Sequence, residues 1–403
     1  MEPVVGIEPT IFCLQNSCST TELNWLLRTD LYTKTGIQQI IVYYECMTEK
    51  QEIINRLLSN TAEVITEDEF RSRIESGEPL THYIGFEISG YVHIGQGIMS
   101  ALVIKDLQAL GVKCTIWLAD WHTAINYKLD GTKETAAKIG RGYFTEAMKA
   151  CLTAVGADAE AVEFRLATDW YAKNMMEYME LTMKVTKKTT RSRILRSIDI
   201  MGREQGDDVE MSRILYPVMQ VADVFYQNLD IVHAGTDQRK VYVIMRDVAK
   251  KLFPEEKKPM AIFHALMPGL NSPEGKMSKS DPDSAIFIHD SGEFIQRKIT
   301  HAYCPEKETE KNPVLNWVKH LLFWNRSEPF HIKRNPEYGG DIEFENFSEL
   351  EVAFQKGDIH PSDLKSAVAS ELIKLLKPIR DHFEKPEIAE MKKELDDVLA
   401  ARR

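Results

Sequence analysis

Apolar and polar positions follow two spacings along residues 47–304. Short apolar runs such as Lys113–Leu118 are typical of buried strands, and apolar residues three and four positions apart predict helices between those runs. The predicted strands cover residues 83–87, 113–118, 162–166, 230–233 and 261–266. Strands that alternate with helices in this way favour an α/β fold with a doubly wound parallel sheet.

Several helices are predicted in more detail. Residues 53–58 carry apolar side chains at helical spacing, and Thr66-Glu-Asp-Glu69 predicts a capping box that opens a second helix. The helix around residues 98–107 is apolar on several faces, so we expect it to be buried on most sides. Residues 133–155, 169–203 and 293–302 are also predicted to be mostly helical.

The chain after residue 304 has a different character. Residues 305–313 are charged and bounded by prolines, so we place a domain boundary there. Pro361 suits the first turn of a helix, and residues 364–376 carry its apolar stripe. Residues 384–403 predict either a charged terminal helix or a frayed tail. The expected units are an extension at 1–46, an α/β domain with a helical insertion at 47–304, and a smaller all-helical domain at 305–403.

Composition narrows the function classes. The formal net charge is −11, which does not exclude a nucleic-acid partner because such binding depends on local basic faces. No apolar run approaches the roughly 20 residues that span a bilayer, so no membrane partner is expected. The six cysteines form no CxxC pair, which argues against zinc, any other bound metal and a disulfide framework. A reducing, cytoplasmic setting is the expectation that follows.

A glycine-rich turn follows the strand at residues 83–87. Gly90, Gly95 and Gly97 let the backbone approach a bulky group, and unpaired amides at the start of the next helix would suit a phosphate. Such a turn is equally common as a simple packing device. The turn therefore predicts a nucleotide site only in combination with other features.

Two polar stripes are predicted on helices. Tyr216, Gln220 and Asp223 are spaced i, i+4, i+7 in an apolar helix, which indicates the wall of a polar ligand pocket or, alternatively, a structural hydrogen-bond network. A second stripe is basic and would share one helix face: Lys184, Lys187, Lys188 and Arg191. It is either a solvated face or a surface for a phosphate backbone.

Two widely separated segments carry a family resemblance. His93-Ile-Gly-Gln96 resembles the HIGH motif of class I aminoacyl-tRNA synthetases, and Lys276-Met-Ser-Lys-Ser280 matches their KMSKS loop. The resemblance implies a Rossmann-like catalytic domain followed by an anticodon-binding domain. The last histidine of the first motif is Gln96 here, and glutamine can donate a hydrogen bond but cannot carry a proton.

The resemblance assigns expected roles around ATP. The catalytic residues would be His93, Gln96, Lys276 and Lys279, of which the two lysines would offset charge that develops on the phosphates. Mg²⁺ is expected to accompany ATP. The residues expected to bind ATP are Gly85, Glu87, His93, Gly95, Lys276, Met277, Ser278, Lys279 and Ser280.

From Met47 to about Glu384 the chain resembles the tyrosyl-tRNA synthetases of the archaeal and eukaryotic type. Tyr83 and Asp223 match positions that bind the hydroxyl of tyrosine. Tyr216, Gln220 and Gln238 match positions that bind its ammonium group, and His122 matches a position that lines the pocket. A homodimer is implied by the resemblance alone.

The resemblance also implies contacts with tRNA(Tyr). Arg196 and Arg239 match residues near the first acceptor-stem base pair, and Tyr338, His360 and Asp363 match residues that read the first anticodon base. An aromatic ring and a carboxylate are what such a base requires. His360-Pro361 is equally a plain helix start.

Residues 1–46 do not follow the pattern of the rest. They hold three of the six cysteines and show no strand or helix period. The alternatives are a targeting peptide, a flexible arm, or a start assigned too early, because codons for Ser17–Leu23 read on the complementary strand like the D-arm of a tRNA gene. We expect the working protein to begin at Met47.

Three other functions remain open. A tryptophanyl enzyme shares this fold, but the Tyr83–Asp223 pair favours a phenol over an indole. A small-molecule nucleotidyltransferase would use a similar glycine turn without needing the basic stripe or the C-terminal domain. The third is an RNA-binding relative without catalytic activity, which Gln96 leaves possible because it replaces the last histidine of the first motif.

Overall fold

The computed structural model describes residues 48–198, 210–272, 277, 281–324, 326 and 328–402. The segment predicted as an extension, residues 1–46, lies outside the described residues. Residues 48–60 are helical, which confirms the first predicted helix. No helix in the described ranges is long and apolar enough to cross a bilayer.

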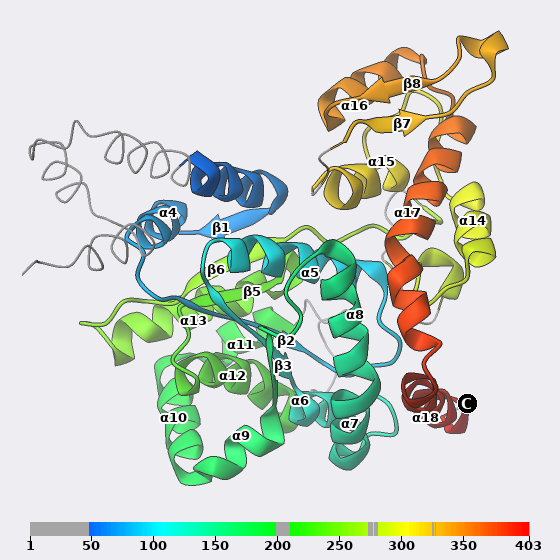
Figure 1. Cartoon of the computed structure of the whole chain (residues 1–403). Helices are drawn as coiled ribbons and strands as arrows, with labels where there is room; N and C mark the ends of the chain where they lie inside the picture. Colours follow the sequence, from blue (N-terminus) through cyan, green and yellow to red (C-terminus); the bar gives the residue numbers. More distant parts are fainter. Residues whose placement is uncertain are drawn as a thin grey trace, which may run out of the picture.

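A six-stranded sheet forms the centre of the α/β part, in the order β1-β6-β5-β2-β3-β4 (Figure 1). Its neighbouring strands run parallel except at the edge, where β1 pairs antiparallel with β6. The strands are β1 (Glu63–Ile65), β2 (Thr81–Phe86), β3 (Lys113–Leu118), β4 (Glu163–Leu166), β5 (Ile231–Gly235) and β6 (Met260–His264). The five predicted strands are confirmed with small shifts at their ends, and β1 is an addition that the pattern did not predict.

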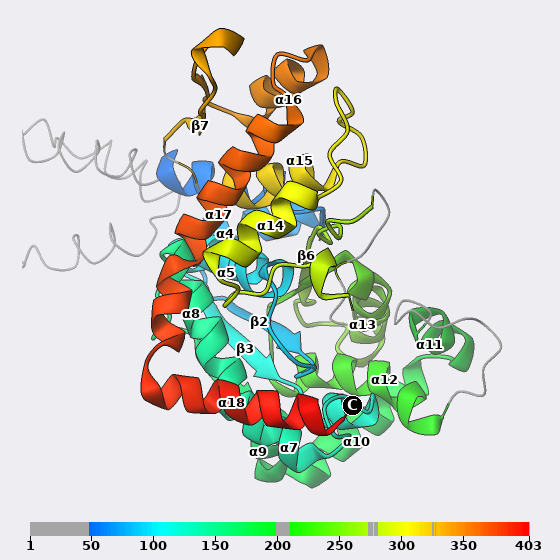
Figure 2. The same cartoon turned by 90° about the vertical axis from the view of Figure 1, so that its right-hand side faces the viewer.

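Helices cover both faces of this sheet, as a doubly wound fold requires (Figures 1 and 2). Ile84 and Phe86 of β2 face one core, which contains α5 and α8, while Tyr83 faces a second core with α12 and α13. This division follows from the alternation of side chains along a strand. The helices of the α/β part are α4 (Glu67–Glu75), α5 (Ile94–Ala109), α6 (Asp120–Ile125), α7 (Lys133–Ile139), α8 (Thr145–Val155), α9 (Ala167–Lys173), α10 (Met175–Lys188), α11 (Arg191–Ile198), α12 (Met211–Tyr226), α13 (Arg239–Leu252) and α14 (Gly292–His301).

One local prediction is wrong, and one predicted helix is confirmed with an irregularity in its middle. Helix α4 begins where expected, but Thr66 adopts a left-handed conformation with φ 65° and makes no side-chain cap. Its hydroxyl donates to the carbonyl of Ile65 instead, so the predicted capping box does not form. The predicted helix at 133–155 is interrupted by a π-helical turn at Gly140–Phe144, where Gly142 leaves helical geometry.

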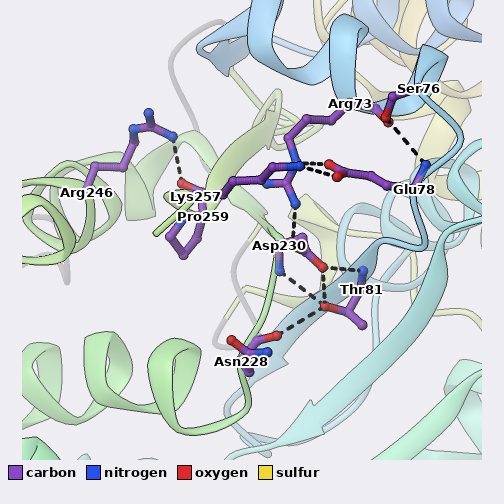
Figure 3. A network of polar contacts seen from close by, with 9 residues as sticks. All are labelled: Arg73, Ser76, Glu78, Thr81, Asn228, Asp230, Arg246, Lys257 and Pro259. Atoms are coloured by element: carbon purple, nitrogen blue, oxygen red, sulfur yellow. Dashed lines mark hydrogen bonds and ion pairs between the residues drawn. The ribbon is translucent and has the colours of Figure 1, made fainter. Parts of the chain in front are cut away.

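A polar network fixes the strands at their amino ends (Figure 3). Arg73 of α4, only 8% exposed, donates to Glu78 and to Asp230, each at 2.5 Å. Asp230 in turn accepts from the Thr81 amide at 2.9 Å and its hydroxyl at 2.8 Å, which joins the starts of β2 and β5. This network leaves the opposite, carboxyl ends of the two strands to form a site.

The C-terminal region is helical, with a short hairpin that the sequence pattern did not predict. The hairpin pairs β7 (Phe330–Ile332) with β8 (Ile342–Phe344), and therefore the region is not all-helical. The helices are α15 (Pro313–Trp317), α16 (Phe347–Lys356), α17 (Pro361–Phe383) and α18 (Pro386–Ala401). Pro361 opens α17 as expected, and its predicted apolar stripe is buried against α14 and α8. Residues 386–401 form a helix, not a frayed tail.

Candidate active site

A cavity of about 540 Å³ opens at the carboxyl ends of β2, β5 and β6, beside the start of α5. This is where ligands bind in doubly wound sheets. Eight of the predicted site residues line the cavity: Gly85, Glu87, His93, Gly95, Gln96, Tyr216, Gln220 and Gln238. The polar stripe and the glycine turn, about 120 residues apart in sequence, thus meet at one cavity.

The glycine turn is held by the segment that follows the second motif. His93 forms a β-bridge with Phe287, and the Ile94 amide donates to the Ile286 carbonyl at 3.0 Å. The amides of Gln96 and Gly97 both donate to the His93 carbonyl. The prediction of unpaired amides is therefore wrong for these three residues, because backbone carbonyls already occupy them.

The glycines of the turn also have a packing role. A Cβ on Gly97 would lie 2.6 Å from the sulfur of Cys151 in α8, so the absence of a side chain lets α5 and α8 pack closely. A Cβ on Gly95 would overlap the methyl group of Met277. Met277 is the described residue of the second motif, and its contact with Gly95 places the two motifs side by side. Lys276 and Ser278–Ser280, including Lys279, lie outside the described residues.

Three buried polar atoms at the cavity have no hydrogen-bond partner among the described residues: Gln96 Oε1, Ser100 Oγ and Gln220 Oε1. Ser100 lies one turn after Gln96 on α5, so both side chains project from the same face. A buried polar group without a partner is costly. The cavity is therefore built for a polar ligand that completes these bonds.

Glu87 connects two walls of the cavity. Its carboxylate accepts from the side-chain amide of Asn126 and lies near the phenol of Tyr216. Burial, together with the nearby Glu87 charge, raises the pKa of Tyr216 well above its usual value, so this phenol stays protonated. Tyr216 therefore presents a neutral hydroxyl at the cavity, which can donate or accept a hydrogen bond.

The polar stripe of α12 reaches the cavity through Gln220. Its Nε2 donates to the Gln238 side chain at 3.4 Å and to the Tyr242 hydroxyl at 3.2 Å. The Tyr242 hydroxyl lies 3.1 Å from that of Tyr83. Tyr83 is buried behind Gly85, where a Cβ would lie 3.2 Å from its hydroxyl oxygen. Gly85 therefore leaves the Tyr83 hydroxyl close to the cavity.

Asp223, the last member of the stripe, is 1% exposed and lies within a ring of aromatic donors. Its Oδ1 accepts from the hydroxyls of Tyr171 at 2.7 Å and Tyr178 at 3.0 Å. Burial raises the pKa of Asp223 to about 7, although these hydroxyls and the Trp117 indole oppose the rise. The network alternative that the sequence left open is thus present here, next to the ligand wall.

His122 stands behind Tyr216, with the two rings edge-to-face at 4.4 Å. Burial lowers the pKa of His122 to about 4, so the imidazole is neutral at pH 7. Neither it nor Tyr83 nor Asp223 lines the cavity. His122 packs on Tyr216 and the Tyr83 hydroxyl bonds with that of Tyr242, and both of these neighbours line it.

Several lining residues were not predicted from sequence: Ser89, Ser100, Asn126, Lys128, Asp237, Tyr242, His264 and Leu266. Asn126 and Lys128 lie on the loop after α6, where Tyr127 and Leu129 both adopt positive φ. Asp237 lies between Gly235 and Gln238 in the turn after β5. Tyr242, one helical turn after Gln238, had no signal in the apolar pattern.

The basic stripe does not share one helix face. Helix α10 ends at Lys188, Thr189 is extended, and α11 begins at Arg191. The prediction of a continuous helix is wrong because this break separates Arg191 from the lysines. Lys184, Lys187, Lys188 and Arg191 are nevertheless all exposed.

The remaining residues expected to contact tRNA lie at two places. Arg196 is exposed on α11, whereas Arg239 at the start of α13 is ion-paired with Glu63 of β1. Tyr338 lies in the 3₁₀ turn between β7 and β8, and His360 and Asp363 open α17.

Arg334 ties these last two elements together. Its guanidinium donates to the Gly340 carbonyl and to the Asp358 carbonyl, each at 2.7 Å. The turn that carries Tyr338 is thus fixed to the loop that precedes His360. Within the described ranges, no three or more His, Cys, Asp or Glu side chains are grouped so as to hold a metal ion.

Comparisons with known proteins agree with this geometry. The family model described as "tRNA synthetases class I (W and Y)" matches residues 75–377. The tyrosine--tRNA ligase of Thermococcus sibiricus is 44% identical over 369 residues, covering 86% of this chain and 97% of that protein. The tyrosine--tRNA ligase of Pyrococcus furiosus is 45% identical over 357 residues, covering 83% and 95%.

Solved structures give the same result. The tyrosyl-tRNA synthetase of Pyrococcus horikoshii, complexed with L-tyrosine, aligns with a TM-score of 0.81 at 43% identity, covering 85% of this chain and 99% of that one. The tryptophanyl-tRNA synthetase of Aeropyrum pernix K1 aligns with a TM-score of 0.62 at 20% identity, which shows a shared fold alone. The chain therefore belongs to the class I tRNA synthetases for tryptophan and tyrosine and, within them, to the tyrosine--tRNA ligases.

Proposed function

We propose that this chain activates tyrosine with ATP and transfers the tyrosyl group to the 3′ end of tRNA(Tyr). One observation carries the proposal: the cavity brings the polar stripe of α12 together with the His93 turn, against which Met277 of the second motif packs. An amino-acid wall and a nucleotide wall then face one another. Membership in the tyrosine--tRNA ligases supports the same conclusion.

The first step joins tyrosine to AMP. A carboxylate oxygen of tyrosine attacks the α-phosphorus of ATP, the bond to the β-phosphate oxygen breaks, and pyrophosphate leaves with that electron pair. The terminal ribose hydroxyl of the tRNA then attacks the tyrosyl carbonyl and releases AMP. Neither step needs a covalent bond to the protein, so positioning and charge stabilisation carry the catalysis.

We assign the nucleotide to the α5 side of the cavity. His93, Gln96 and Ser100 line the cavity there from the N-cap and first turns of α5, and Gly95 borders the same space. Lys276 and Lys279 would offset the phosphate charge. Mg²⁺ would arrive with ATP, and Glu87 and Asp237 at the cavity offer the carboxylate oxygens that this ion prefers.

The tyrosine would lie against α12. Tyr216, Gln220 and Gln238 offer oxygen acceptors for its ammonium group, and the Gln220 Oε1 that lacks a partner supports this role. The phenol hydroxyl would bind between Tyr83 and Asp223. Tyr83 reaches toward this space beside Gly85, and Asp223 would accept the hydrogen bond that phenylalanine cannot donate.

The tRNA would contact two surfaces. The exposed lysines of α10 with Arg191, Arg196 and Arg239 would follow the acceptor end, and Tyr338, His360 and Asp363 would read the anticodon. The Arg334 bonds that join the β7–β8 turn to the start of α17 support a single anticodon site. Arg239 would have to exchange Glu63 for a phosphate.

A homodimer is also part of the proposal. Three methionines on α10, spaced i, i+3, i+7, are 47–70% exposed: Met176, Met179 and Met183. An exposed apolar stripe of this kind is typical of a protein–protein interface. We expect the enzyme to work in the cytoplasm, where its tRNA is used.

Aminoacylation tests the proposal as a whole. The enzyme is incubated with ATP, labelled tyrosine and a tRNA(Tyr) transcript, and with a matched transcript whose first anticodon base is replaced. We expect tyrosine on the first transcript and markedly slower charging of the second. Equal charging of both would remove the anticodon assignment, and no charging of either would contradict the proposed function.

A further inference from the structure

The C-terminal helix α18 turns away from the end of α17 and lies across the α/β part, far from β7 and α16 (Figure 2). The cavity and its lining residues do not include it. Its inner side is nevertheless well packed, because Leu395 is fully buried and Ile388 is 6% exposed. Helix α18 is therefore firmly packed although it contributes no residue to the cavity lining.

One set of contacts joins α18 to the glycine turn. The hydroxyl of Tyr91, two residues before His93, donates to the Asp396 carboxylate. Lys392 pairs with the same carboxylate at 2.9 Å, and its ammonium group lies 5.4 Å from the centre of the Tyr91 ring. Tyr91 is therefore held by α18 through a hydrogen bond and a cation–π contact.

Tyr91 passes this contact on to the catalytic turn. Its ring packs edge-to-face on Phe287 at 5.7 Å and on His289 at 4.9 Å. Phe287 forms the β-bridge with His93. Hence one aromatic layer separates α18 from the backbone that presents His93.

A second set of contacts joins α18 to the loop after α6, which also contributes residues to the cavity lining. The Arg402 guanidinium, just past the end of α18, donates to the Tyr127 carbonyl at 3.1 Å. Tyr127 lies between Asn126 and Lys128, which both line the cavity, and its φ of 51° is one that a side chain rarely adopts. Two further contacts hold α18 along its length: Glu394 pairs with Lys138 at 3.0 Å, and Met391 packs on Gly142.

We propose that α18 is a positioning element for ATP, which holds the His93 turn and the Lys128 loop at the separation that the nucleotide requires. The proposal rests on the assignment of ATP to this cavity. Tyr91, Asp396 and Arg402 are positioning residues, because they act through the turn and the loop and do not line the cavity themselves.

Single variants of the full chain test the two anchors. Tyr91→Phe and Asp396→Ala each remove the same hydrogen bond, the first by removing its donor and the second by removing its acceptor. Arg402→Met removes the other, because the methionine side chain has no N–H to donate. From the ordinary value of a hydrogen bond, each is expected to raise the KM for ATP in tyrosine-dependent pyrophosphate exchange by about fivefold. The affinity for tyrosine, which binds against α12, should not change.

A double variant and a matched control complete the design. Tyr91→Phe with Asp396→Ala should have the KM of either single variant, because each substitution removes the same hydrogen bond. Asp381→Ala is the control, since Asp381 forms the same i, i+4 ion pair with a lysine on α17 but has no contact with the His93 turn or the Lys128 loop. It should match the wild type.

Each result decides the proposal. A wild-type KM for ATP in Asp396→Ala and Arg402→Met would overturn it, as would an equal loss of ATP and tyrosine affinity, which would indicate general loosening. Additive effects in the double variant would overturn the Tyr91–Asp396 link. Absence of exchange in the wild type would instead contradict the proposed function, so the two failures are distinguishable.

Discussion

Asp223 offers a quantitative test of the buried network behind the tyrosine wall. Its carboxyl is 1% exposed, and burial raises its pKa from 3.8 to about 7. The folded protein therefore binds the proton more tightly than the unfolded chain. Stability from this site is fully present below pH 3.8 and is lost as the pH rises through about 7.

The size of the loss follows from the two pKa values. Between pH 5 and pH 8 the site should remove about 2.5 kcal/mol from the free energy of unfolding, by proton linkage. Asp223→Asn cannot titrate, so this variant should lack the loss whatever constant effect the amide has on stability. The free energy of unfolding of the variant, relative to wild type, should rise by the same amount over that range.

Urea unfolding of both proteins at pH 5, 6, 7 and 8, followed by tryptophan fluorescence, measures the difference. Titrations of other groups cancel because they are shared. Asp169→Asn is the control, since Asp169 is a 54% exposed carboxylate on α9 and should give a flat difference. A flat difference for Asp223→Asn as well would refute the reasoning, because Asp223 would then ionise in the fold without cost.

Four further predictions concern function. Asp223→Ala should weaken discrimination of tyrosine from phenylalanine in exchange assays, and unchanged selectivity in a folded variant would remove Asp223 from the pocket. Lys279→Ala should slow adenylate formation in single-turnover assays while tyrosine affinity stays nearly intact, since late charge stabilisation lowers the rate more than binding; an equal loss of both would indicate a structural role. Lys184→Gln with Lys187→Gln should flatten the salt dependence of tRNA binding without affecting pyrophosphate exchange. The slope of log affinity against log salt concentration falls by roughly one for each phosphate that is no longer neutralised, and an unchanged slope would make the stripe a solvated face. A chain that starts at Met47 should keep full aminoacylation activity, and a loss of activity would show that the preceding residues are needed.

The fold was predictable because its signals are local. The apolar runs at residues 113–118 and 261–266 have the length of a strand and are shorter than a typical helix, which favours buried strands. The i, i+4, i+7 spacing of Tyr216, Gln220 and Asp223 indicates that these side chains share a helix face. Paired motifs far apart in sequence then identified the end of the sheet where a site would form.

What the sequence did not predict depends on contacts between distant segments. Thr66 does not cap α4 because it adopts a left-handed conformation, and the strands of the β7–β8 hairpin are too short to show an alternating pattern. Lys128 reaches the cavity because a loop with two positive φ residues turns it there. The hydrogen bonds from Tyr171 and Tyr178 to Asp223 Oδ1 need three helices to meet, which no spacing along one helix reveals.

The central claim is that this cavity activates tyrosine. Tyrosine-dependent exchange of labelled pyrophosphate into ATP measures that step alone, without tRNA. We predict rapid exchange with tyrosine, and exchange near background with tryptophan and phenylalanine at the same concentration. Exchange that tryptophan supports as well as tyrosine, or no exchange with any of the three amino acids, would contradict the account.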